Sequence, residues 1–214
     1  GRFRVGMAAL VLVASVLFGG LSAALFPGVS MAAGEKERAR DLFVKGAEAV
    51  EAGRPAEGLP LLLEAESLFH APTHLLYIAR AQAATGKLID ARSTYEKLAT
   101  EKLPPKASKP FQEAQATAKA ELPKITDRIP KLVVRVEPAA AGLDVTLDGA
   151  TLPRALGEPI EIDPGAHTVV ARAPGYLDAT VTVTAPEARE TVVSVKLSPV
   201  AKGQDAPSTP TEPD

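Results

Sequence analysis

The spacing of apolar residues divides the chain into three regions. An unbroken apolar run covers residues 7–26. Between residues 35 and 129 apolar side chains recur at helical spacing, and Gly53-Arg54-Pro55 and Thr85-Gly86-Lys87 separate helices. Between residues 131 and 198 apolar and polar positions alternate, with Asp-Gly and Pro-Gly pairs between the runs. The pattern predicts an α+β protein with helices first and strands second.

The N-terminal region, residues 1–32, has the features of an export signal. Arg2 and Arg4 precede the apolar run, Pro27-Gly28 follows it as a helix-breaking pair, and Ser30 and Ala32 are the small residues before a cleavage site. Cleavage is expected after Ala32. The run is also close to the length that spans a bilayer, so an uncleaved inner-membrane anchor stays open. Either way the rest of the chain is expected in the periplasm or outside the cell, with membrane contact only through residues 7–26.

Composition narrows the possible functions. The chain has no cysteine, which excludes disulfides and thiolate metal sites. Aromatic residues make up 4% of the chain, which disfavours base-stacking and sugar-stacking surfaces. A formal net charge of −2 provides no electrostatic attraction for nucleic acid, so none is expected as a partner.

The helical region contains a repeat. Gly53 and Gly86 are 33 positions apart, and small residues recur around them at matching positions: Gly46 with Ala79, Gly58 with Ala91, and Ala65. Small residues at such positions let paired helices approach closely. Residues 39–104 therefore resemble the tetratricopeptide-repeat (TPR) family, whose period is about 34. The departures from the family pattern are Lys45, Gln82 and Leu98.

A fifth helix is expected to start at Ser108-Lys109-Pro110, and its apolar stripe runs from Phe111 to Leu122. It would cap the open end of the repeat, because end repeats need a neighbour over their apolar side. Pro123 is expected to end or kink this helix.

The alternating region predicts six short strands and a small antiparallel β-sandwich. The segments 145–149, 163–169 and 174–176 carry a resemblance to the PEGA domain, a β-sandwich of bacterial envelope proteins. One departure is that the name-giving Pro-Glu-Gly is Pro164-Gly165 here. Residues 199–214 are rich in Pro, Ser, Thr and Asp, and they are expected to be a disordered tail.

Candidate chemistry is sparse. His70 and His74 have an i,i+4 spacing that suits a metal, but Pro72 between them predicts that they do not share a helix face. His167 is expected to lie on a strand and to face solvent. Four acids, Asp144, Asp148, Glu161 and Asp163, resemble calcium ligands or an acid pair, yet alternation places the first two on the solvent face. No catalytic motif occurs, so no enzyme activity, metal or cofactor is expected.

The TPR resemblance implies a peptide-binding groove on the first helix of each repeat. Six residues are the candidates for contact with a partner: Arg40, Phe43, Glu51, Thr73, Leu76 and Arg80. Phe43 and Leu76 would form an apolar strip, with arginines that pair with acids of a bound peptide. The alternative is that the fifth helix or the sandwich covers this strip as ordinary core.

These features predict a non-enzymatic, exported cell-envelope protein. In this hypothesis the TPR-like repeat, within residues 35–129, binds other envelope proteins or peptides, and the PEGA-like sandwich of residues 131–198 is a spacer or docking module. The alternative is a protein that binds cell-wall polysaccharide through the sandwich.

Overall fold

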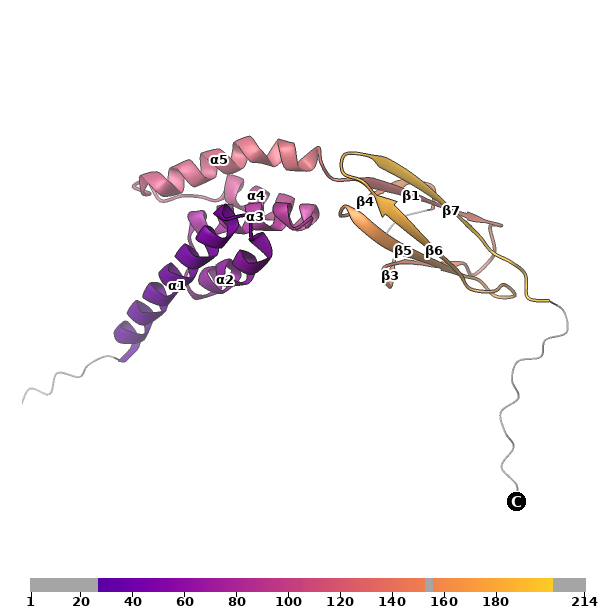
Figure 1. Cartoon of the computed structure of the whole chain (residues 1–214), viewed down its shortest axis with the longest axis horizontal. Coiled ribbons are helices and arrows are strands. Elements are labelled where there is room, and N and C mark those ends of the chain that lie inside the picture. The colour runs from indigo at the N-terminus through magenta and orange to yellow at the C-terminus, as the bar shows by residue number, and fades with distance from the viewer. Residues whose placement is uncertain (1–26, 153–155, 202–214) are drawn as a thin grey trace, which may run out of the picture.

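The computed structural model describes residues 27–152 and 156–201, which form a helical lobe followed by a lobe of strands (Figure 1). The helices are α1 (Pro27–Glu51), α2 (Pro55–Leu68), α3 (Pro72–Ala84), α4 (Leu88–Thr100) and α5 (Lys109–Thr126). The strands are β1 (Lys131–Glu137), β2 (Asp144–Leu147), β3 (Ala150–Thr151), β4 (Pro159–Glu161), β5 (Gly165–Arg172), β6 (Ala179–Ala185) and β7 (Glu190–Lys196). The α+β class is confirmed at this level. The apolar run of residues 7–26 and the tail beyond residue 201 lie outside the described residues.

Prolines and glycines set the inner helix boundaries where the sequence predicts them. Pro55 and Pro72 open α2 and α3, in the first turn where a missing N–H leaves no hydrogen bond unmade. Gly53 and Gly86 follow α1 and α3 with φ of 75° and 79°, a region that glycine enters without strain.

The start of α1 differs from the prediction. The described part of α1 begins at Pro27 and includes Gly28, whereas the sequence predicts the helical region to begin at residue 35. The predicted cleavage point after Ala32 therefore lies within α1. Among residues 27–152 and 156–201, no helix combines the length and the apolar character needed to cross a membrane.

Helices α1 and α2 approach closely where the sequence places small residues. A Cβ added at Gly58 would lie 2.5 Å from the carbonyl oxygen of Gly46 and 2.9 Å from the Val50 side chain. Any side chain at Gly58 would therefore push the two helices apart.

Helix α5 covers α3 and α4, as expected of a capping helix. Ala114, Ala118 and Ile125 of α5 join a core cluster with Leu88 and Tyr95, whose exposed fractions are at most 6%. Pro123 lies inside the last turn of α5, which ends at Thr126.

The strands form two sheets that share one core. The strand order is β4-β1-β7 in the first sheet and β3-β2-β5-β6 in the second. Leu132 and Val195 from the first sheet pack with Val145 and Val169 from the second. This is the sandwich arrangement that alternation predicts.

One strand pairing corrects the predicted antiparallel sandwich. β1 and β7 run parallel, from Lys131 beside Glu190 to Glu137 beside Lys196, so the first sheet is mixed. Alternation predicts which side chains face the core but not the direction of the neighbouring strand. The structure also adds the short strand β3 to the six strands that the sequence predicts.

Polar contacts join the two lobes. Asp163 of the strand lobe accepts a hydrogen bond from the N–H of Ile89 at 2.9 Å, in the first turn of α4. One helical turn further on, Arg92 pairs with Glu161 at 2.7 Å. In a third contact, Arg128 donates two hydrogen bonds to the carboxylate of Glu187, each 2.8 Å long. The sandwich thus supplies the side chain that caps α4.

Candidate functional site

A cavity of the helical lobe lies between α1, the α2–α3 connection, the start of α3 and the start of α5. Its volume is about 480 Å³. It is lined by Ala33, Lys36, Glu37, Ala39, Arg40, Phe43, Val44, Phe69, Ala71, Thr73, His74 and Phe111. The lining is mostly apolar, and Lys36, Glu37 and Arg40 of α1 supply its charged groups.

Aromatic rings form one wall of this cavity. The Phe43 ring stacks on the imidazole of His74 with 4.8 Å between centroids, and it meets the Tyr77 ring edge-on at 5.4 Å. Phe69 and Val44 expose 40% and 44% of their surface, an unusual exposure for large apolar side chains beside a cavity. The packed Phe43–His74 pair gives the cavity a firm wall, whereas Phe69 and Val44 are available to a ligand.

The rim of the cavity carries more positive than negative charge. Lys36 places its Nζ 5.2 Å from the centre of the Phe69 ring. Arg40 is exposed and makes no ion pair or hydrogen bond with the described residues. Glu37 is the acid among the lining residues. The Arg40 guanidinium is therefore free to pair with an acidic group of a ligand.

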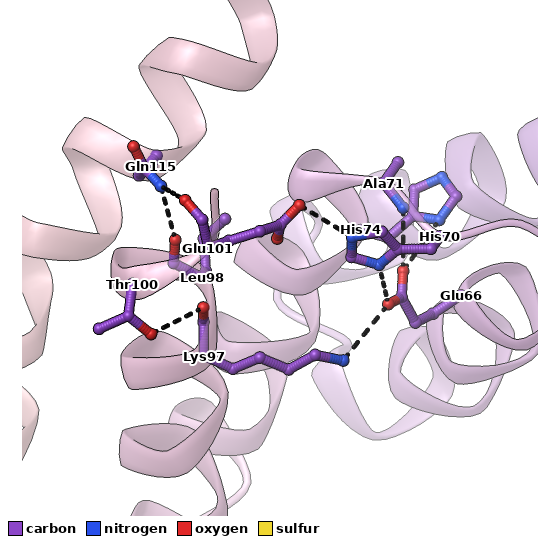
Figure 2. Close-up of polar contacts among 9 residues, drawn as sticks. All are labelled: Glu66, His70, Ala71, His74, Lys97, Leu98, Thr100, Glu101 and Gln115. Atoms are coloured by element: carbon purple, nitrogen blue, oxygen red, sulfur yellow. Dashed lines mark hydrogen bonds and ion pairs between the residues drawn. The ribbon is translucent and has the colours of Figure 1, made fainter. Parts of the chain in front are cut away.

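A cluster of ionisable side chains adjoins the cavity (Figure 2). Glu66 of α2 faces His70, His74 and Lys97, and Glu101 at the end of α4 approaches the other side of His70. His74 belongs to both features, because its ring also lines the cavity. The cluster joins α2, α3 and α4.

His70 lies between two carboxylates. Its Nδ1 contacts Glu66 and its Nε2 lies 3.0 Å from Glu101 Oε1. Carboxylate oxygens are acceptors, so this position between two carboxylates favours the imidazolium form, in which both ring nitrogens donate. The hydrogen bonds to Glu66 and Glu101 raise the pKa of His70 accordingly. Burial works to raise the pKa of Glu66, but its contacts with the two histidines and the Ala71 N–H outweigh burial and lower it.

His74 is the buried member of the cluster, with 7% of its side chain exposed. Its Nδ1 lies 3.6 Å from Glu66 Oε2, which is too long for a hydrogen bond, and it has no hydrogen-bond partner among the described residues. His70 precedes α3 whereas His74 lies inside it, as Pro72 predicts. The two rings nevertheless converge on one carboxylate. No group of three or more potential metal ligands occurs in the part of the chain that the structure describes.

The six candidate residues divide between two environments. Arg40, Phe43 and Thr73 line the cavity. Leu76 is 7% exposed in the core that α5 completes. Arg80 donates two hydrogen bonds to Glu121 of α5, at 2.6 and 3.1 Å. The structure therefore separates the apolar strip expected from Phe43 and Leu76.

Polar contacts between α5 and the helices that it covers explain why this part of the expected groove is closed to a ligand. Glu121 accepts bonds from Arg80 and, at 2.7 Å, from the Tyr95 hydroxyl. Burial tends to raise the pKa of Glu121, but these donors hold it below its ordinary value. Burial and Glu121 together raise the pKa of Tyr95. Glu51, the sixth candidate, accepts a hydrogen bond from the Tyr77 hydroxyl outside the cavity.

Among the residues that the structure describes, the four acids of the sandwich do not form a group that could hold a metal ion. Asp148 contacts His167 Nδ1 at 2.7 Å, and the carbonyl oxygen of Asp163 lies 2.7 Å from Nε2 of the same ring. Burial lowers the pKa of His167, but these acceptors more than compensate and raise it. His167 is therefore a half-buried link between two turns, with 12% of its side chain exposed, and it does not face solvent as the sequence predicts.

Sequence reasoning missed Phe69, Phe111 and the Glu66 cluster. Phe69 follows the last turn of α2 and Phe111 opens α5, so neither falls on a repeat position. Both come from segments far from α1 in the sequence. A scan against models of protein families found no match to this chain, and a search of the curated proteins found none either.

Proposed function

We propose that this chain is a non-enzymatic protein-interaction module, exported to the cell envelope, that binds a peptide segment of another envelope protein in the cavity beside α1. The observation that carries the proposal is the cavity itself. Exposed apolar side chains, Val44 and Phe69, lie beside the unpaired cation Arg40. A peptide with an apolar side chain next to an acidic one matches these features.

Export would change the cavity in a specific way. Ala33 would become the N-terminal residue after the predicted cleavage, and Ala33 lines the cavity. Its α-ammonium group would add a positive charge to the rim formed by Lys36 and Arg40. Cleavage would thereby strengthen binding of an acidic peptide. Mass spectrometry of the N-terminus of the exported protein tests this step, and a start other than Ala33 would remove the third charge from the proposal.

The binding test uses two fluorescein-labelled peptides. One carries a Leu-Phe pair flanked by Asp and Glu, and in the other Lys replaces both acids. We expect the acidic peptide to bind more tightly by fluorescence anisotropy, and its affinity to fall as salt is raised. Equal affinity for the two peptides would refute the proposed ligand chemistry.

Matched variants locate the site on α1. Arg40→Glu is expected to weaken binding by about 10-fold or more, since a charge-assisted hydrogen bond contributes about 1.5–3 kcal/mol. Lys45→Glu makes the same charge reversal at an exposed position of α1 that does not line the cavity. It is expected to leave the affinity within about 2-fold, because long-range interactions between exposed charges are screened. Equal losses in both variants would mean that net charge alone drives binding.

A further inference from the structure

The sandwich has four edge strands that differ in how they are protected. β3 has two residues, and β4 has three and begins with Pro159. β7 has charged residues at both ends, Glu190 and Lys196. β6 has seven residues without a charge or a proline, and it pairs only with β5 among the described strands. Short length, charges and prolines are the usual protection of an edge against another strand, and β6 has none of them.

The sequence of β6 is palindromic. It reads Ala-Thr-Val-Thr-Val-Thr-Ala from residue 179 to 185, with Thr182 at its centre. The threonines at 180, 182 and 184 are exposed, whereas Val181 and Val183 pack partly against the sandwich core. On each face of the strand, the order of residues is therefore the same when the strand is read from either end.

We propose that β6 pairs antiparallel with β6 of a second copy of this chain, about a two-fold axis at Thr182. In this register Thr182 faces its own counterpart, and each Val181 faces Val183 of the other copy. Opposed residues in an antiparallel pair project to the same face of the sheet. The threonines then meet threonines outside, the valines meet valines inside, and the two four-stranded sheets become continuous.

Length and charge both favour a second copy as the occupant. The new pairing would have seven residue pairs, as many as β6 makes with β5. No ionisable side chain lies on β6, so the pairing brings no like charges together. The flanking acids are already neutralised, since Asp178 pairs with Arg172 and Glu187 with Arg128, each at 2.8 Å. An interface of one strand pair is small, so the dimer is expected to be weak and concentration-dependent.

Cysteine cross-linking tests the register. The chain has no cysteine, so each introduced thiol is unique in its copy. In the proposed dimer the two Cα atoms at position 182 lie roughly 4.5–5.5 Å apart, within disulfide range. Those at position 180 are separated by four residues along the strands, roughly 13 Å. With diamide as oxidant, Thr182→Cys is expected to form covalent dimer at least 10-fold faster than Thr180→Cys. Equal rates, or no covalent dimer of Thr182→Cys, would overturn the register.

Sedimentation velocity over a concentration series tests the dimer itself. The unmodified chain is expected to show a mass increase toward the dimer as its concentration rises. Thr182→Lys places two ammonium groups on the axis and is expected to remain a monomer. Ser194→Lys is the matched control, because Ser194 is an exposed residue of the other long edge strand, β7. A monomer at every concentration, or equal loss of dimer in both lysine variants, would refute pairing through β6. Unchanged circular dichroism verifies that the variants are folded.

Discussion

The substitution Gly58→Ala tests the close approach of α1 and α2, the feature that connects the repeat-like sequence to its packing. The added methyl group would lie 2.5 Å from the Gly46 carbonyl oxygen, about 0.9 Å short of an ordinary contact at 3.4 Å. Overpacking of this kind costs about 1–3 kcal/mol. Alanine in place of glycine inside a helix stabilises the fold by about 1 kcal/mol. We therefore expect a net destabilisation of about 1 kcal/mol.

Gly34→Ala is the matched control. Gly34 lies in α1, and a Cβ added there would have no neighbouring atom within 4 Å, so the same methyl group meets open space. This variant is expected to gain up to about 1 kcal/mol from helix propensity alone. The comparison removes the propensity effect and leaves the steric effect. Urea denaturation followed by the helical circular dichroism signal measures both. Equal stabilisation by the two substitutions would refute the close approach.

Three further predictions concern the ionisable contacts. Arg80→Ala leaves the half-buried Glu121 without its cation. We expect the free energy of unfolding, measured by urea denaturation, to fall by about 1 kcal/mol, a value already reduced for partial solvent exposure of the pair. No loss would mean that the packing of α5 does not depend on this pair. Asp163→Ala removes the side chain that caps α4. Hydrogen exchange of the amides in the first turn of α4 should become about 5-fold faster, since a cap contributes about 1 kcal/mol. Unchanged exchange would contradict the contact between the lobes. The raised pKa of His70 means that its stabilisation is complete below pH 6.5 and is lost as the pH rises through the folded-state pKa. The stability difference between the unmodified chain and His70→Gln should therefore shrink toward alkaline pH, and a pH-independent difference would show that His70 is not charged in the folded state.

Local sequence signals were sufficient for the helices and for most of the strands. Pro55, Gly53 and Gly86 act through their own backbone preferences, so their effect does not depend on the rest of the fold. The small residues Gly46 and Gly58 were also informative, because close helix packing leaves no room for any other side chain.

The site depended on contacts between distant segments. Three candidate residues, Arg40, Phe43 and Thr73, line the cavity because they lie on the faces of α1 and α3 that α5 leaves open. Leu76 and Arg80 lie on the same helix as Thr73 but are covered by α5. A helical period identifies a face, but it cannot say how much of that face a later helix covers.

What the sequence alone determined is the order of helices before strands, the alternation within the strands and the inner turns, since each follows from periodicity or from one residue's backbone preference. Only the tertiary structure decided the parallel pairing of β1 with β7, the cap that Asp163 provides to α4, and the convergence of His70 and His74 on Glu66. These contacts join residues whose positions depend on every helix and strand that packs between them. Their geometry is a property of the packed chain, and no local pattern encodes it.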